Sequence, residues 1–114
     1  MRALVLVVLP SDVVDVSEMI KEILSKYEED SHKDQIGWPY WDFWSYWNPR
    51  KEEFSNFPHN CYCSVVELGD LNVVFAGVFL PSGGLIDCME TTKKWETVKD
   101  AYLSDTCYFI LLHI

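Results

Sequence analysis

Basic residues are scarce in this sequence. Its 114 residues include 9 Lys and Arg against 18 Asp and Glu, which gives a formal net charge of -9. Proteins that bind nucleic acids or anionic membranes draw much of their affinity from Lys and Arg, so the composition argues against direct binding to either. Complementary charge speeds and directs protein association. We therefore expect a basic protein as the binding partner.

Long hydrophobic runs are also missing. The N-terminal apolar run, Ala3 to Leu9, has seven residues, whereas a membrane-spanning helix needs about 20. Asp12 and Asp15 follow this run without the small residues of a signal-peptide cleavage site, so the sequence predicts a cytoplasmic protein. Its four cysteines have apolar or β-like neighbours, and we expect them to be reduced and buried.

The hydrophobic pattern predicts one α+β domain over residues 1–114. Ala3–Leu9 is typical of a buried strand, and Asp15 with Glu18 indicates the capping box of a helix with apolar residues at helical spacing. The second half predicts further strands and a helix, in the ranges 61–68, 73–80, 85–89, 92–103 and 107–114. This order favours a ferredoxin-like β-α-β-β-α-β sandwich with an insertion after the first helix.

The predicted insertion is unusually aromatic. Seven of the ten residues from Trp38 to Trp47 are Trp, Tyr or Phe. Pro39 suits the first turn of a helix, and Trp41 and Trp44 would share one face of it with Trp47, so we expect an aromatic helix. Such a helix packs onto the core, or leaves rings exposed as interface hot spots. A cage for a cationic ligand is a third interpretation.

Two polar loops, residues 28–37 and 50–60, flank the aromatic segment and carry acidic side chains. Asn48-Pro49 is expected to end the aromatic helix. In the second loop, Phe54 and Phe57 are expected to anchor the chain onto the body of the domain.

A metal site has weak support in the sequence. His59, Cys61 and Cys63 are zinc-ligand residue types, but structural zinc sites space their cysteines two to four residues apart on a turn. Alternation on a strand would point both cysteines to one face with awkward reach. We interpret them as small buried residues and expect no metal or other cofactor.

Enzyme chemistry has little support either. Cys88 or Cys107 with His113 supplies a thiol and a base, but no orienting acid is indicated. Gly83-Gly84 lacks the Lys-Ser or Lys-Thr of a phosphate-binding loop. We therefore expect a protein that is not an enzyme and has no catalytic residues.

The order of these features resembles a group of small uncharacterised proteins of bacteriophages and mobile elements. The resemblance rests on ALVLVVLP, on Trp41-Asp42-Phe43-Trp44, on VFAGVFLPSGG and on the C-terminal strand ending in His113-Ile114. The chain departs from that group at two places, with YWNPR instead of a Gly-Gly-Arg-Trp stretch and LPSG instead of Thr-Pro-Asp-Gly. The resemblance implies an anti-defence inhibitor of the anti-CRISPR kind, acting in the cytoplasm of the host cell.

These observations predict a non-enzymatic inhibitor that docks a basic host or defence protein, such as a nucleic-acid-binding nuclease, through acidic loops and exposed aromatics. The alternative is a small-ligand or nucleotide-messenger binding protein, a sponge with an aromatic pocket. An uncovered sheet edge or aromatic helix would also permit a homodimer. The expected partner-binding residues are Glu28, Glu29, Asp30, Trp38, Trp41, Asp42, Trp44, Trp47, Glu52 and Glu53.

Overall fold

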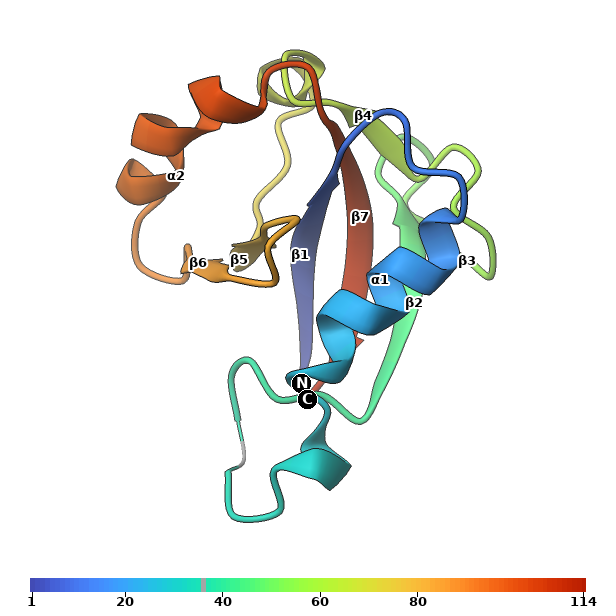
Figure 1. Cartoon of the computed structure of the whole chain (residues 1–114), viewed down its shortest axis with the longest axis vertical. Coiled ribbons are helices and arrows are strands. Elements are labelled where there is room, and N and C mark those ends of the chain that lie inside the picture. The colour runs from blue at the N-terminus through green and yellow to red at the C-terminus, as the bar shows by residue number, and fades with distance from the viewer. Residues whose placement is uncertain (36) are drawn as a thin grey trace.

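The N-terminal run forms one of the two central strands of a seven-stranded sheet in a computed structural model, which describes residues 1–35 and 37–114 (Figure 1). The strands are β1 (Arg2–Leu9), β2 (Phe43–Asn48), β3 (Glu53–Ser55), β4 (Tyr62–Ser64), β5 (Gly77–Phe79), β6 (Leu85–Asp87) and β7 (Thr106–His113). The helices are α1 (Val16–Ser25) and α2 (Lys93–Val98), with 3-10 turns η1 (Glu29–Ser31), η2 (Glu67–Asp70) and η3 (Lys99–Tyr102). Residue 36, in the predicted loop 28–37, lies outside the described residues.

The strand order confirms the α+β class but not the ferredoxin-like topology. β1 and β7 pair antiparallel along their whole length at the centre of the sheet. The order is β3-β2-β7-β1-β5-β6, and β4 also pairs with β7. The ferredoxin-like plan is a split β-α-β unit, in which another strand separates the parallel strands. Here the parallel strands β1 and β5 are direct neighbours.

Each face of the sheet has its own hydrophobic core. Val5 and Val7 of β1 belong to the core on the face covered by α1. Leu6 and Val8 belong to the core on the opposite face, together with Trp95 of α2. A strand covered on both faces needs apolar side chains at successive positions, which explains the unbroken N-terminal run.

The helix α1 begins and packs as predicted. The backbone N–H of Glu18 donates to Oδ1 of Asp15 at 3.1 Å, and Ile20, Ile23 and Leu24 are buried in the core on its side of the sheet. The second helix is shorter than predicted, because the chain after α2 tightens into the 3-10 turn η3.

The aromatic segment forms a strand, so the helix predicted there is wrong. β2 pairs antiparallel with the C-terminal half of β7. Aromatic side chains fit the pleated, half-buried surface of a sheet, and along a strand they alternate between its faces. Trp44 and Tyr46 accordingly pack on the α1 side, and Trp47 packs on the other. Asn48 ends the strand, immediately before Pro49.

Three of the predicted strands are shorter than expected. β4, β5 and β6 occupy three residues each inside the ranges 61–68, 73–80 and 85–89. Ser64 and Glu67 form a reciprocal pair after β4: the N–H of Glu67 donates to Oγ of Ser64 at 3.1 Å, and the N–H of Ser64 donates to Oε1 of Glu67 at 3.3 Å. This capping-box arrangement turns the chain out of the sheet and into η2.

All four cysteines are buried free thiols. Cys61 lies in the core on the α1 side and Cys63 in the opposite core, so the prediction that both point to one face is wrong. Cys61 lies just outside β4 and directly after Asn60, which has a φ of 63°, so regular strand alternation does not extend to Cys61. Within residues 1–35 and 37–114, none of the helices has the length and apolar character needed to cross a bilayer.

Candidate functional site

The sheet face opposite α1 is only partly covered. In the view of Figure 1, the side chains that pack over its upper part come from α2, η2 and the loop after η2. Near the two chain termini, which lie side by side in Figure 1, the described residues provide no second layer over the same face. Seven residues from four strands line a shallow hollow there, and one of them, Leu112, belongs to the core on the α1 side. We call the other six the open face: Arg2, Phe43, Ser45, Phe54, Leu111 and His113.

The strand register explains why these residues meet. His113 of β7 lies opposite Phe43 of β2 on one side and opposite Arg2 of β1 on the other. Two residues earlier on β7, Leu111 lies opposite Ser45 of β2. Residues two apart along a strand share a face, so both rows belong to the open face.

The exposed aromatics of the open face are Phe43 and Phe54, with 64% and 53% of their surface accessible to solvent. The guanidinium carbon of Arg2 lies 5.0 Å from the centroid of the Phe54 ring, within the range of a cation–π contact. Arg2 starts from β1 and Phe54 from β3, with β7 and β2 between them. Both side chains therefore lie flat along the sheet, and the hollow between them has a volume of only about 70 Å³.

Trp47 extends this apolar surface towards the β2–β3 hairpin. Its ring meets the Phe54 ring edge-on, with centroids 5.4 Å apart and planes at 82°. Trp47 and Leu4 also line a neighbouring cavity of about 400 Å³, whose wall includes Glu52. The open face thus continues into a larger hollow with an acidic side chain at its edge.

A histidine–carboxylate pair closes the other end of the open face. Nδ1 of His113 and Oδ1 of Asp42 are 2.7 Å apart, and both side chains are about half exposed. The hydrogen bond with His113 is the main reason that the pKa of Asp42 lies below its ordinary value. Asp42 is therefore held as a carboxylate beside Phe43.

The predicted tryptophans fall in different surroundings. Trp41 is only 8% exposed, and its Nε1 donates to the carbonyl of Leu24 at 2.9 Å, so a partner cannot reach its ring in the folded protein. Trp38 and Trp44 are partly buried on the α1 side of the sheet. Of these four predicted site residues, Trp47 alone lies beside the open face.

The predicted acidic residues form two groups at opposite ends of β2. Glu28, Glu29 and neighbouring Asp30 lie near its start, where the N–H of Glu29 donates to the carbonyl of Trp41 at 2.7 Å. Glu53 pairs with Asn48 at its end, and Glu52 lies in the preceding turn. A six-residue strand is roughly 17–20 Å long, so the structure does not bring the two groups into one cluster.

The candidate metal ligands and the Cys107–His113 pair are not brought together among the residues that the structure describes. Groups of three or more His, Cys, Asp or Glu side chains placed to hold a metal ion are absent from residues 1–35 and 37–114. Cys107 and His113, considered as a thiol and a base, stand at opposite ends of β7, roughly 20 Å apart along an extended strand.

Sequence reasoning missed most of the open face. The prediction that Phe54 and Phe57 both anchor their loop is wrong for Phe57, which is 70% exposed. Phe54 is 53% exposed, but its ring contacts Trp47. The missed signal is the alternation of Phe43, Ser45 and Trp47, which a strand places on a single face. Arg2 and His113 carry no comparable signal, because only the pairing of β1 with β7 brings them together.

No family model matches this chain, and no curated protein or solved structure matches it. The open face offers two exposed phenyl rings, a guanidinium group and a histidine–carboxylate pair.

Proposed function

We propose that this chain is a non-enzymatic binding protein that docks a basic protein on the open face and Trp47. The observation that carries the proposal is the uncovered part of the sheet, where Phe43 and Phe54 are both more than half exposed. Aromatic side chains dominate the binding energy of many protein interfaces. Apolar surface gathered in one place, rather than scattered singly, is typical of interaction sites.

The charges around the open face favour a basic partner. Asp42 is next to Phe43 in the chain, and Glu52 lines the hollow beside Trp47. The two basic side chains of the open face already have contacts, Arg2 with the Phe54 ring and His113 with Asp42. An apolar centre with a polar rim is the usual anatomy of an interface, and here the rim and the net charge of -9 are acidic.

The resemblance to phage proteins supports a more specific form of the proposal. In this form the partner is a host or defence protein, such as a nuclease with a channel lined by Lys and Arg. The acidic rim takes the place of nucleic-acid phosphates in that channel. The chain then acts as an anti-defence inhibitor of the anti-CRISPR kind in the host cytoplasm.

The alternative, a sponge for a nucleotide messenger, depends on an aromatic pocket formed by residues 38–47. The rings of this segment are divided between the two faces of the sheet, with Trp44 and Tyr46 on one and Trp47 on the other. This division favours docking of a protein surface over enclosure of a ligand by the aromatic segment.

The proposal is tested by capture from host lysate, followed by titration of the captured protein with purified variants. Phe43→Ser combined with Phe54→Ser should weaken binding by at least tenfold, since two hot-spot rings are removed. The matched control is Phe57→Ser, because Phe57 is also a highly exposed phenylalanine but lies outside the open face. Circular dichroism checks that every variant is folded.

Charge is tested separately with Asp42→Lys combined with Glu52→Lys. We expect slower association and a weaker dependence of binding on salt, because both changes reverse charges at the rim. Full affinity in the Phe43/Phe54 double variant would contradict the docking surface. An acidic captured partner, or none at all, would contradict the proposed partner class.

A further inference from the structure

We propose that a second site, at a fork in the sheet, binds a small phosphate-bearing ligand of the nucleoside monophosphate kind. The fork lies along one edge of β7, where β2 pairs with residues 110–113 and β4 with residues 106–108. The far end of β2 leaves this edge and pairs with β3. The resulting space, which we call the fork cavity, has a volume of about 370 Å³ and is lined by Asn48, Arg50, Lys51, Asn60 and Tyr62. This inference does not depend on the open face.

The fork cavity is basic in an acidic protein. Two of the nine Lys and Arg residues of the chain, Arg50 and Lys51, line it, and no carboxylate does. Neither residue forms a salt bridge within the described part of the chain. The next residue, Glu52, lines the separate cavity beside Trp47 instead. In the β2–β3 turn, the two cationic side chains thus line the fork cavity, and the acidic side chain lines the other cavity. This separation favours an anionic ligand in the fork cavity.

Arg50 is held across the fork. Its Nη1 donates to the carbonyl of Tyr62 on β4 at 3.3 Å, although Arg50 itself comes from the turn after β2. A guanidinium group has five N–H donors in a planar fork that matches phosphate oxygens. One contact with Tyr62 therefore orients the group and leaves donors for a phosphate, with the Lys51 ammonium as a second cation.

Asn48 supplies a buried amide at the wall of the fork cavity. It is 6% exposed, and its Oδ1 accepts the backbone N–H groups of Arg50 at 3.0 Å and Lys51 at 3.2 Å. Two donors on one atom establish that this atom is the amide oxygen. The Nδ2 group forms no hydrogen bond to another described residue, so its two donors remain for a ligand. Asn60 adds a second amide from the other side of the fork.

Tyr62 supplies an aromatic surface beside these polar groups. Its side chain is 45% exposed, and its ring packs at a tilt against Tyr108, with centroids 5.7 Å apart. Nucleobases stack on such rings without strict sequence preference. A cavity of this volume falls in the range of small-ligand sites, and the combination of a ring, two cations and two amides matches a base, a phosphate and a sugar.

The test uses the intact protein and adenosine 5′-monophosphate as the probe, with inorganic phosphate and adenosine as comparison ligands. Calorimetry should show saturable binding of the nucleotide with a dissociation constant below about 5 mM, which is a weak but measurable affinity. Amide chemical shifts should change at residues 48–51 and 60–62. Inorganic phosphate and adenosine should each bind at least tenfold more weakly, because each occupies only part of the cavity.

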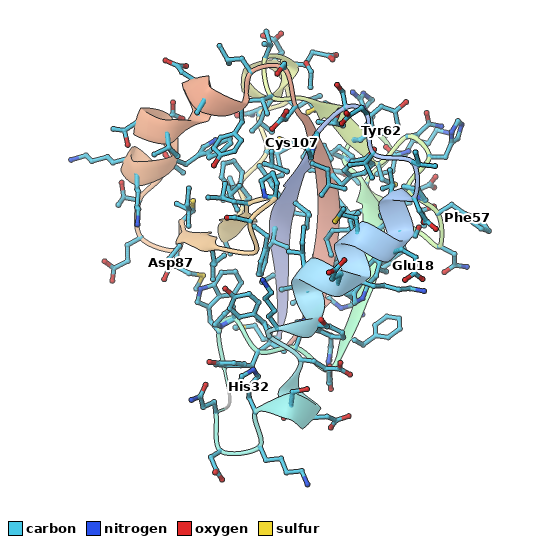
Figure 2. The ribbon with its side chains drawn as sticks, viewed as in Figure 1. Glu18, His32, Phe57, Tyr62, Asp87 and Cys107 are labelled. Carbon is cyan, nitrogen blue, oxygen red and sulfur yellow. The ribbon has the colours of Figure 1, made fainter. Side chains whose placement is uncertain are left out.

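Variants locate the site. Arg50→Gln and Lys51→Gln should each weaken nucleotide binding about tenfold, as expected for loss of a charge-assisted hydrogen bond, and Tyr62→Leu should remove the advantage of the nucleotide over phosphate. The control is Lys33→Gln, since the loop around His32 lies at the opposite end of the molecule from Tyr62 (Figure 2). The proposal is overturned by the absence of saturable binding, by shifts confined to other residues, by equal loss in the control, or by phosphate binding as tightly as the nucleotide.

Discussion

Arg2 and Phe54 are in contact across two intervening strands, with the guanidinium carbon 5.0 Å from the ring centroid. The contact lies over Ser45 and Leu111, which belong to the same hollow. Exposed cation–π pairs contribute about 0.5–1 kcal/mol, and the apolar stem of an arginine shields further surface. The pair therefore stabilises the open face while leaving the rings of Phe43 and Phe54 accessible to solvent.

We expect Arg2→Ala to lower the free energy of unfolding by about 1 kcal/mol, because the cation–π contact and the packing of the stem are both lost. Arg2→Met keeps an unbranched apolar side chain and should lose only part of that amount. Urea denaturation at neutral pH measures both effects. Lys33→Ala is the surface control and should change the stability by less than about 0.5 kcal/mol. Equal stability of Arg2→Ala and the wild type would show that the contact has no energetic role.

Trp41 and Trp44 should respond differently to the same substitution. Trp41 is buried and donates a hydrogen bond to the carbonyl of Leu24 near the end of α1, so Trp41→Phe removes this bond and part of a packed ring. We expect a loss of about 2–3 kcal/mol in the free energy of unfolding. Trp44 is only partly buried, and Trp44→Phe should cost less than about 1 kcal/mol. Chemical denaturation followed by circular dichroism makes the comparison, and a smaller loss for Trp41→Phe would contradict the structural role given to its ring.

The elements that the sequence predicts well are those whose pattern is local. The apolar run of β1 and the Asp15 cap of α1 each lie within a few adjacent residues, and both are confirmed. The turn after β4 also has a local signal, because Ser64 and Glu67 have capping-box spacing. It was missed because the apolar residues around it favour a longer strand.

The open face depends on contacts that are distant in the sequence. Phe43 meets His113 only because β2 pairs with β7, and no local pattern specifies that pairing. Aromatic residues on both faces of β2 also remove the alternation of polar and apolar residues that identifies most strands. The spacing of Trp41, Trp44 and Trp47 then favoured a helix, although the preference of aromatic residues for strands pointed the other way.

The hydrogen bond between His113 and Asp42 should make stability depend on pH in acid. The pKa of Asp42 is lowered in the folded protein, mainly by this bond. Its contribution to stability is therefore present above the unfolded pKa of about 3.9 and is lost as the pH falls through the lower folded value. We expect wild type to be more stable than Asp42→Asn at pH 6, and this difference to shrink below about pH 4. Urea denaturation at several pH values measures the difference.

The matched control for this pH series is Asp34→Asn, which removes an exposed carboxylate from the loop before the aromatic segment. The free energy of unfolding of Asp34→Asn should change with pH in the same way as that of the wild type. Direct titration of the Asp42 carboxyl by NMR should give a pKa below the ordinary value, and a return to that value in His113→Ala. A normal pKa for Asp42 in the wild type would contradict the hydrogen bond.

Cys63 and Cys107 lie directly opposite each other on β4 and β7, and their burial should make stability depend on pH in alkali. Burial raises the pKa of Cys63 to about 11 and raises that of Cys107 as well. A thiol whose pKa is higher in the folded state stabilises the fold fully below its unfolded pKa, and this contribution is lost as the pH rises towards the folded value. We therefore expect the stability advantage of wild type over Cys63→Ala to shrink between about pH 9 and pH 11, whereas the effect of Phe57→Ser should stay constant.

At pH 8 iodoacetamide should modify the thiols of Cys63 and Cys107 only as fast as the protein unfolds, because the thiolate is the reactive form. Rapid modification of Cys63 in the native protein would show that the thiol is accessible and that its burial in the core is wrong.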